Sequence, residues 1–134
     1  GWKNFMGYFE EYEFDAPRAS REGKLLFASA LAQRLKNPKL VIHREMPILW
    51  HRSDGECVEG IMDLAAWDPE RKHWLIVDWK TNLIGPDGHE HLRAMYEPQL
   101  RAYAEALHEI SGASVEAGVH STVTGGWIPC ADLS

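Results

Sequence analysis

The sequence predicts an α/β fold of the α+β kind, in which an antiparallel meander of three strands is flanked by helices. Three apolar, strand-like runs follow one another with turn residues between them. One helical pattern precedes this meander, and a second helical pattern with one or two further strands follows it. The chain of 134 residues is long enough for one domain with a hydrophobic core and too short for two. We therefore expect residues 1–134 to form a single domain.

An N-terminal helix is predicted from about Pro17 to Lys36. Asp15 is placed to cap it, and proline is tolerated in a first helical turn. Pro38 ends the helix, because the residue before a proline disfavours helical backbone. The aromatic-rich residues 1–12 are expected to form a short helix or a docking segment. The apolar residues spaced for one face of the predicted helix are Leu25, Ala28, Leu31, Ala32 and Leu35.

Turn residues divide the meander. Ser53-Asp54-Gly55 predicts a hairpin turn, and Asp68-Pro69-Glu70 predicts a second turn. Pro47 indicates an edge or a bulge in the first strand, because proline cannot donate a ladder hydrogen bond. The three strands are predicted at about residues 39–50, 57–67 and 73–80.

Residues 82–95 are predicted to be a polar loop. His89 and His91 in this loop could contact a metal ion. No cysteine or carboxylate spacing supports such a site, so the expectation is a solvated, mobile loop.

A second helix is predicted from about Pro98 to Ile110, with Gly112 ending it. Residues 115–123 predict a further strand, and residues 127–129 predict either another strand or a tail. The apolar stripe of the helix consists of Tyr96, Leu100, Tyr103, Leu107 and Ile110.

Composition and charge restrict the function classes. Hydrophobic residues make up 45% of the chain and charged residues 25%, as in an ordinary globular protein. No apolar run is long enough to span a membrane and no secretory leader is visible, so no membrane partner is expected. The formal net charge of −6 counts against strong autonomous DNA binding. It is compatible with an acidic metal site whose substrate is delivered by a partner.

The two cysteines, Cys57 and Cys130, do not form a close pair in the sequence. We expect reduced thiols in a cytoplasmic setting. Two cysteines also cannot supply the four ligands of an iron–sulfur cluster. The chain begins at Gly1 without methionine, and we expect it to be a domain excised from a larger protein.

Two of the predicted strands carry acidic residues with the spacing of a metal site. Asp78 and Lys80 project from one strand face, roughly 6.6 Å apart along the strand. If the neighbouring strand pairs with matched faces, Asp63 joins them, and two carboxylates beside an amine can hold a hard divalent cation next to a phosphate. The alternative for Asp78 and Lys80 is a surface ion pair. The apolar residues 75–77 favour the site, because a carboxylate at the end of a buried strand needs a partner or a metal.

An ordered set of motifs resembles the RecB/AddA-type nucleases of the PD-(D/E)XK superfamily, the C-terminal nuclease domains of helicase–nucleases. The motifs are Gly60-Ile-Met-Asp63, then Asp78-Trp-Lys80-Thr81, then Gln99-Leu-Arg-Ala-Tyr103 in a helix. The resemblance implies a restriction-endonuclease-like core with a mixed central sheet. It also implies hydrolysis of DNA phosphodiester bonds with Mg²⁺ or Mn²⁺, leaving 5′-phosphate and 3′-hydroxyl ends. No phosphate-binding loop for ATP is present in the chain, so the resemblance places any helicase portion elsewhere in the parent protein.

The resemblance also implies roles for single residues. Asp63, Asp78 and the carbonyl of Trp79 match metal-ligand positions, and Lys80 matches the catalytic lysine. Glu45 matches an upstream acidic position, with an exposed strand residue as the alternative. The last pair, Gln99 and Tyr103, matches a helix motif that supports the site and the DNA strand; a core-facing helix pair is the alternative.

Many RecB-like nucleases carry a histidine ligand on the first long helix, where this chain has Phe27. Phenylalanine cannot coordinate a metal cation, and His43 is a weaker substitute candidate. The departure keeps open a catalytically inactive nuclease fold that guides DNA or docks a partner. A stand-alone RecB-like nuclease is a further alternative to the nuclease domain of a helicase–nuclease acting in DNA repair and recombination.

Overall fold

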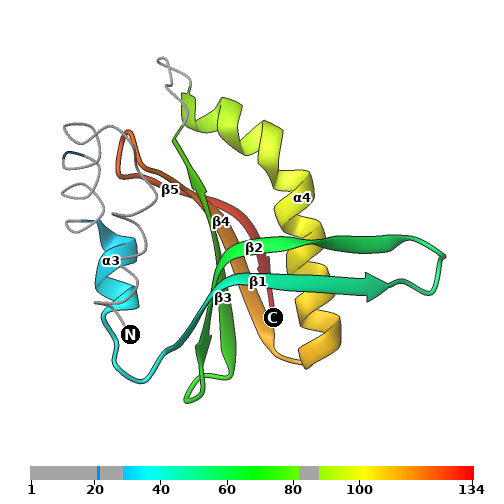
Figure 1. Cartoon of the computed structure of the whole chain (residues 1–134). Helices are drawn as coiled ribbons and strands as arrows, with labels where there is room; N and C mark the ends of the chain where they lie inside the picture. The colour runs from blue at the N-terminus through cyan, green and yellow to red at the C-terminus, as the bar shows by residue number, and fades with distance from the viewer. Residues whose placement is uncertain (1–20, 22–28, 82–87) are drawn as a thin grey trace.

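A mixed five-stranded sheet forms the centre of the structure (Figure 1). The computed structural model describes residue 21 and residues 29–81 and 88–134. Its elements are α3 (Ala30–Leu35), β1 (Val41–His51), β2 (Cys57–Asp68), β3 (His73–Lys80), α4 (Gly88–Ser111), β4 (Ser114–Ser121) and β5 (Trp127–Leu133). The strands follow the order β1-β2-β3-β4-β5, with β3 and β4 parallel and the other neighbours antiparallel. The predicted α+β class, with its antiparallel meander in a mixed sheet, is confirmed.

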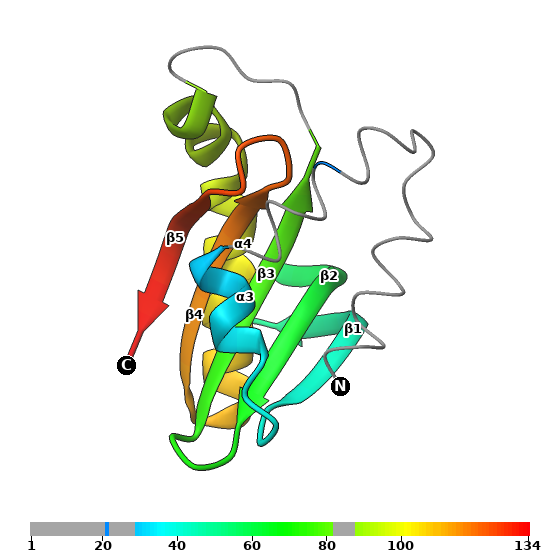
Figure 2. The ribbon, with the colours of Figure 1, turned by 90° about the vertical axis from the view of Figure 1, so that its left-hand side faces the viewer.

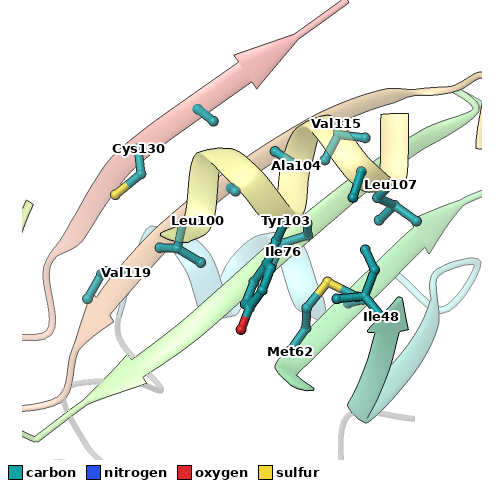
Figure 3. Close-up of a cluster of buried hydrophobic side chains, with 14 of the residues drawn as sticks. Ile48, Met62, Ile76, Leu100, Tyr103, Ala104, Leu107, Val115, Val119 and Cys130 are labelled. Atoms are coloured by element: carbon teal, nitrogen blue, oxygen red, sulfur yellow. The ribbon is translucent and has the colours of Figure 1, made fainter. Parts of the chain in front are cut away.

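Helices α3 and α4 lie on opposite faces of the sheet (Figures 1 and 2). On one face α3 buries Leu31 and Leu35 against Leu64, Leu75 and Val77 of the central strands. The other face carries the larger cluster, which α4 covers (Figure 3). The core is therefore a three-layer helix–sheet–helix arrangement, in which the side chains of β3 alternate between the two clusters.

The β1–β2 hairpin bends (Figure 1). Its register skips Glu45 and Asp63, which lie between the pairs Arg44–Leu64 and Met46–Met62. Met62 belongs to the cluster under α4, whereas Leu64, two residues later, belongs to the cluster under α3. Regular alternation would put both side chains on one face, so the strand turns over between them. Glu45 has a left-handed backbone, with φ 51°, which permits the matching turn in β1. The outer part of the hairpin stays paired and thus turns toward α4, where Ile48 and Met62 join the cluster under that helix.

Both predicted turns are confirmed. At the hairpin tip Gly55 has φ 91°, and its N–H donates to the carbonyl of Arg52 at 3.1 Å. After β2, Asp68 Oδ1 accepts from the N–H groups of Glu70 and Arg71 at 3.1 and 3.2 Å. The alternative left open for residues 127–129 is decided in favour of a strand, since β5 starts at Trp127.

The prediction of one continuous helix from Pro17 to Lys36 is wrong at Ser29. Ser29 has extended backbone angles, φ −73° and ψ 158°, and is the N-cap of α3. Its Oγ accepts from the N–H of Ala32 at 3.1 Å, which satisfies a donor that a helix start leaves unpaired. The helical spacing of leucine and alanine continues through this break, so the pattern did not reveal it. The aromatic segment 1–12 and the proposed cap Asp15 lie outside the described residues.

The predicted loop at residues 82–95 is wrong from residue 88 onward. Helix α4 begins at Gly88, buries Leu92, and passes through Pro98 without ending. Figure 1 shows a bend in the helix, as expected where an interior proline removes a backbone hydrogen bond. His89 Nε2 contacts Thr124 Oγ1 at 2.7 Å, which ties the first turn to the β4–β5 connection. Tertiary packing therefore outweighs the local preference of proline for a helix start.

Two further findings bear on the expectations from composition. Cys57 is exposed, Cys130 is buried, and both are free thiols. No helix within residues 29–81 or 88–134 is long and apolar enough to cross a membrane.

Candidate active site

Asp63 and Asp78 meet where the pairing between β2 and β3 ends. The last paired residues are Leu64 and Val77, one step before the two aspartates. Beyond that point the N–H of Trp79 donates to Asp63 Oδ2 at 2.8 Å. The bend at Asp63 therefore replaces the next ladder bond with a carboxylate that accepts from the main chain of β3.

The environment of Asp63 favours its neutral form. Burial raises the pKa of Asp63, a hydrogen bond shared with the Asp78 carboxyl raises it further, and the hydrogen bond from the Trp79 N–H opposes both effects. The net result is a pKa of about 7, raised from 3.8. Two carboxyl groups this close cannot both be ionised cheaply without a proton or a cation between them.

Lys80 forms an ion pair with Asp78. Its Nζ lies 2.8 Å from Asp78 Oδ2, and the two side chains are only 22% and 15% exposed. Burial alone would lower the pKa of Lys80, but the hydrogen bond and charge of Asp78 outweigh burial and raise it. Lys80 is therefore a firmly charged ammonium group in a partly buried pair, unlike the solvated surface pair considered from the sequence.

The oxygen atoms of this site fit a hard cation. Asp78 Oδ2 is buried, and apart from the Lys80 ammonium group, which lies 2.8 Å away, no group in the part of the chain that the structure describes donates a hydrogen bond to it. Buried carboxylate oxygens with spare acceptor capacity are suitable ligands for Mg²⁺ or Mn²⁺. Within the described ranges no group of three or more histidine, cysteine, aspartate and glutamate side chains gathers, so the acidic centre is the Asp63–Asp78 pair.

Gln99, Tyr103 and Gly60 form a packed unit beside the carboxylates. Gln99 Nε2 donates to the Tyr103 hydroxyl at 3.1 Å, and the charges of Asp78 and Asp63 contribute, after burial, to a raised pKa of Tyr103. The Tyr103 ring reaches from α4 past Ile76 and Met62 (Figure 3). A Cβ at Gly60 would lie 2.0 Å from the Tyr103 hydroxyl oxygen, so only glycine fits beneath the ring. The helix motif and the Gly60–Asp63 motif are thus in direct contact.

Glu45 lies on β1 across from Asp63, at the bend of the hairpin, and is exposed. The described residues do not gather it into a three-carboxylate group with Asp63 and Asp78. The ring of His43 packs 5.9 Å from that of Trp74, near the opposite end of β3 from Asp78. His43 therefore lies away from the Asp63–Asp78 pair, and Phe27 lies outside the described residues.

Sequence reasoning gave no role to two residues that contact Lys80. Thr122 donates to the Lys80 carbonyl from its N–H at 2.9 Å and from its hydroxyl at 3.2 Å. The ring of Tyr96 lies under the Lys80 ammonium group. The position of Tyr96 one turn before Gln99 was a usable signal, whereas the contact of Thr122 depends on the parallel pairing of β3 and β4.

The chain matches the PD-(D/E)XK nuclease superfamily over residues 8–125. It is 29% identical over 101 residues to an ATP-dependent helicase/nuclease subunit of Alkaliphilus oremlandii (strain OhILAs), a match that covers 67% of this chain and 8% of that protein. The protein of the same name from Carboxydothermus hydrogenoformans (strain ATCC BAA-161 / DSM 6008 / Z-2901) is 32% identical over 103 residues, covering 68% of this chain and 9% of that protein. The protein of that name from Desulforudis audaxviator (strain MP104C) is 31% identical over 98 residues, covering 63% of this chain and 8% of that protein.

The match therefore spans less than a tenth of the length of these curated relatives. The resemblance to helicase–nucleases expected from the motifs is confirmed by relatives of that name. Because the superfamily match extends over most of the sequence, this chain belongs to the PD-(D/E)XK nuclease superfamily.

Proposed function

We propose that this chain is the metal-dependent nuclease domain of an ATP-dependent helicase–nuclease of the RecB/AddA type, acting as a DNA exonuclease in repair and recombination. Residues 1–134 would form one nuclease domain, with the helicase portion elsewhere in the parent protein or in a separate partner protein. The names of the three relatives support this assignment. Such a role implies a cytoplasmic setting.

The observation that carries the proposal is the meeting of Asp63, Asp78 and Lys80 at the end of β3. Burial and then the neighbouring Asp78 carboxyl raise the Asp63 pKa to about 7, and Lys80 lies 2.8 Å from Asp78. Two carboxylates held this close repel each other and destabilise the folded protein unless a cation or a proton is bound between them.

Each residue has a distinct part in the proposed reaction. Asp63 and Asp78, with the Trp79 carbonyl, would hold Mg²⁺ or Mn²⁺ through oxygen atoms. When bound, such an ion polarises a phosphate oxygen and lowers the pKa of a water ligand. Lys80 would orient the attacking water or donate to phosphate oxygens on which negative charge develops. Gln99 and Tyr103 would support the DNA strand beside them.

The test is digestion of linear and circular DNA, each single- and double-stranded, with Mg²⁺, with Mn²⁺ and with EDTA. We expect metal-dependent cleavage that Asp78→Ala and Lys80→Ala each reduce by at least about 100-fold, the usual cost of losing a group that stabilises developing charge. The matched control is Lys39→Ala, which removes an exposed lysine paired with Glu70 away from the site. Near wild-type, metal-dependent activity in either site variant would refute the proposed function.

An inactive nuclease fold that guides DNA or docks a partner is the second candidate. Phe27 favours it, because it stands where many relatives of this type carry a histidine ligand. The same digestion separates the candidates. Metal-dependent cleavage by the wild-type chain rejects the inactive fold, whereas DNA binding without cleavage under all conditions supports it.

A further inference from the structure

The Lys80 ammonium group lies between a carboxylate and an aromatic ring. Its Nζ is 4.1 Å from the centroid of the Tyr96 ring and 2.8 Å from Asp78 Oδ2. An ammonium group within about 6 Å of a ring centroid is attracted by the negative face of the ring. Two separate interactions therefore fix the end of this long side chain.

The main chain of Lys80 is fixed independently of its side chain. Lys80 pairs with Ser121 in the parallel β3–β4 ladder, and its carbonyl accepts two hydrogen bonds from Thr122, at 2.9 and 3.2 Å. With the main chain held, the position of the ammonium group depends on a flexible four-carbon stem and on the contacts of its end.

Cation binding would affect the two contacts of Lys80 differently. A carboxylate that binds a cation offers less negative charge to a neighbouring ammonium group, so the Asp78 contact would weaken. The Tyr96 ring carries no formal charge and is not one of the oxygen donors that a hard cation prefers. Its attraction for Lys80 would therefore persist while Asp78 serves as a ligand.

We propose that Tyr96 is a positioning residue that holds the Lys80 side chain in the active site; the catalytic consequence rests on the proposed function. Tyr96, Gln99 and Tyr103 are spaced at i, i+3 and i+7 on α4, so they lie on one stripe of the helix. The stripe thus carries a support for the lysine in addition to the Gln99–Tyr103 pair. The contact uses the ring face and not the hydroxyl, so phenylalanine is expected to replace Tyr96.

The first test detects the contact without any activity measurement. In protein labelled with [¹³C]lysine, the ε-methylene signal of Lys80 is assigned by its loss in Lys80→Ala. We expect a ring-current shift of this signal in the wild type and in Tyr96→Phe. In Tyr96→Leu the signal is expected to remain but to lose the ring-current shift. Met95→Ala changes the exposed neighbour of Tyr96 on α4 and is expected to leave the signal unchanged.

The second test measures cleavage kinetics with Mg²⁺ for the same variants. Tyr96→Phe is expected to retain wild-type kcat, whereas Tyr96→Leu lowers kcat by about 5- to 30-fold with little change in KM, a range that matches the strength of cation–π contacts. Circular dichroism melting verifies folding. If Tyr96→Leu does not fold, Tyr96→Met removes the ring with another good helix former.

The outcomes separate this inference from the proposed function. An unshifted Lys80 signal in the wild type, or an unchanged one in Tyr96→Leu, overturns the positioning role. Equal loss of kcat in Tyr96→Phe and Tyr96→Leu also overturns it, because the hydroxyl would then be the important group. If the wild type does not cleave DNA, the proposed function fails, and the NMR comparison alone decides whether Tyr96 holds Lys80.

Discussion

Gly60 and Tyr103 show how single residues of the two motifs depend on each other. Alanine at position 60 would bring its Cβ within 2.0 Å of the Tyr103 hydroxyl oxygen and 2.7 Å of Cζ. Tyr103 is buried within the α4-side core and cannot move aside freely. We predict that Gly60→Ala lowers the free energy of unfolding by about 1–3 kcal/mol, the usual range for overpacking, as measured by urea denaturation.

The matched control places Gly60→Ala in a Tyr103→Leu background. Without the ring the added methyl group has space, and alanine is about 0.5–1 kcal/mol more favourable than glycine within a strand. The substitution is then expected to be neutral or stabilising. An equal cost in both backgrounds would show that the ring is not the reason for glycine at position 60.

Strand periodicity was sufficient to predict that Asp63, Asp78 and Lys80 converge. It did not predict how they do so, because Asp63 lies at a bend where Met62 and Leu64 enter different core clusters. The pattern of apolar and polar residues does not predict the left-handed backbone at Glu45. The contact of Tyr96 with Lys80 joins a helix to a strand end, and pairings of this kind arise only in the folded chain.

Helix α3 is attached to the sheet by a network of charged groups as well as by its leucines. Arg34 donates to both carboxylate oxygens of Glu116 on β4, at 3.0 and 2.8 Å. His73 Nε2 lies 3.4 Å from the same carboxylate, and its Nδ1 lies 2.7 Å from Ser114 Oγ. The hydrogen bond from Arg34 is the main cause of a lowered pKa of Glu116, with the charge of Arg34 and the His73 contact adding to it and burial opposing.

We predict that Glu116→Gln destabilises the protein at pH 7 but not in acid. A carboxyl group with a lowered pKa in the folded state stabilises above its ordinary pKa, and that contribution disappears as the pH falls through the lowered value. Arg34 is 44% exposed, so solvent screening limits the expected loss at pH 7 to about 0.2–1 kcal/mol. Urea denaturation at pH 7 and in acid measures the difference between wild type and variant.

Glu70→Gln is the control for the Glu116→Gln prediction. Glu70 pairs with Lys39 on the surface, where both side chains are more than half exposed, and a smaller loss is expected. A loss for Glu116→Gln that stays constant into acid would mean that packing rather than charge explains the effect.

At the scale of elements, signals between neighbouring residues predicted the meander. The bounds of the two helices were predicted wrongly, because they depend on contacts and caps that the apolar pattern does not show. Turn residues and alternating strands act over a few positions, and both turns are where the sequence places them. Helix α4 begins ten residues before Pro98 because its first turns pack on the core and on the β4–β5 connection. Ser29 interrupts an otherwise helical pattern because its side chain caps α3.

The whole molecule combines a net charge of −6 with an acidic centre that holds two carboxyl groups together. Negative charge repels DNA phosphates, so a cation at the site would serve binding as well as chemistry. A cation would also remove the repulsion between Asp63 and Asp78, which otherwise favours a proton on Asp63. The stability of the metal-free protein is therefore expected to depend on pH through this centre.

The sign of that dependence follows from the Asp63 pKa of about 7, raised from 3.8 first by burial and then by Asp78. A folded state that raises the pKa of a carboxyl group favours the protonated form. Its stabilising contribution is complete below about pH 4 and is lost as the pH rises through 7. In EDTA we predict that the melting temperature of the wild type falls between pH 5 and pH 8 relative to that of Asp63→Asn, a window taken from this shift.

Asp63→Asn lacks this titration and is expected to be more stable than the wild type at pH 8 in EDTA. Mg²⁺ is expected to raise the melting temperature of the wild type at pH 8, because a ligand that binds only the folded state stabilises it, and to raise that of Asp63→Asn less. His120 is present in both proteins, so comparing the wild type with Asp63→Asn removes its contribution. Burial lowers its pKa to about 4, so its contribution is lost as the pH falls from 6.5, the opposite direction. A difference in melting temperature between the wild type and Asp63→Asn that stays level from pH 5 to pH 8 in EDTA, with no response to Mg²⁺, would contradict a close carboxyl pair at the end of β3.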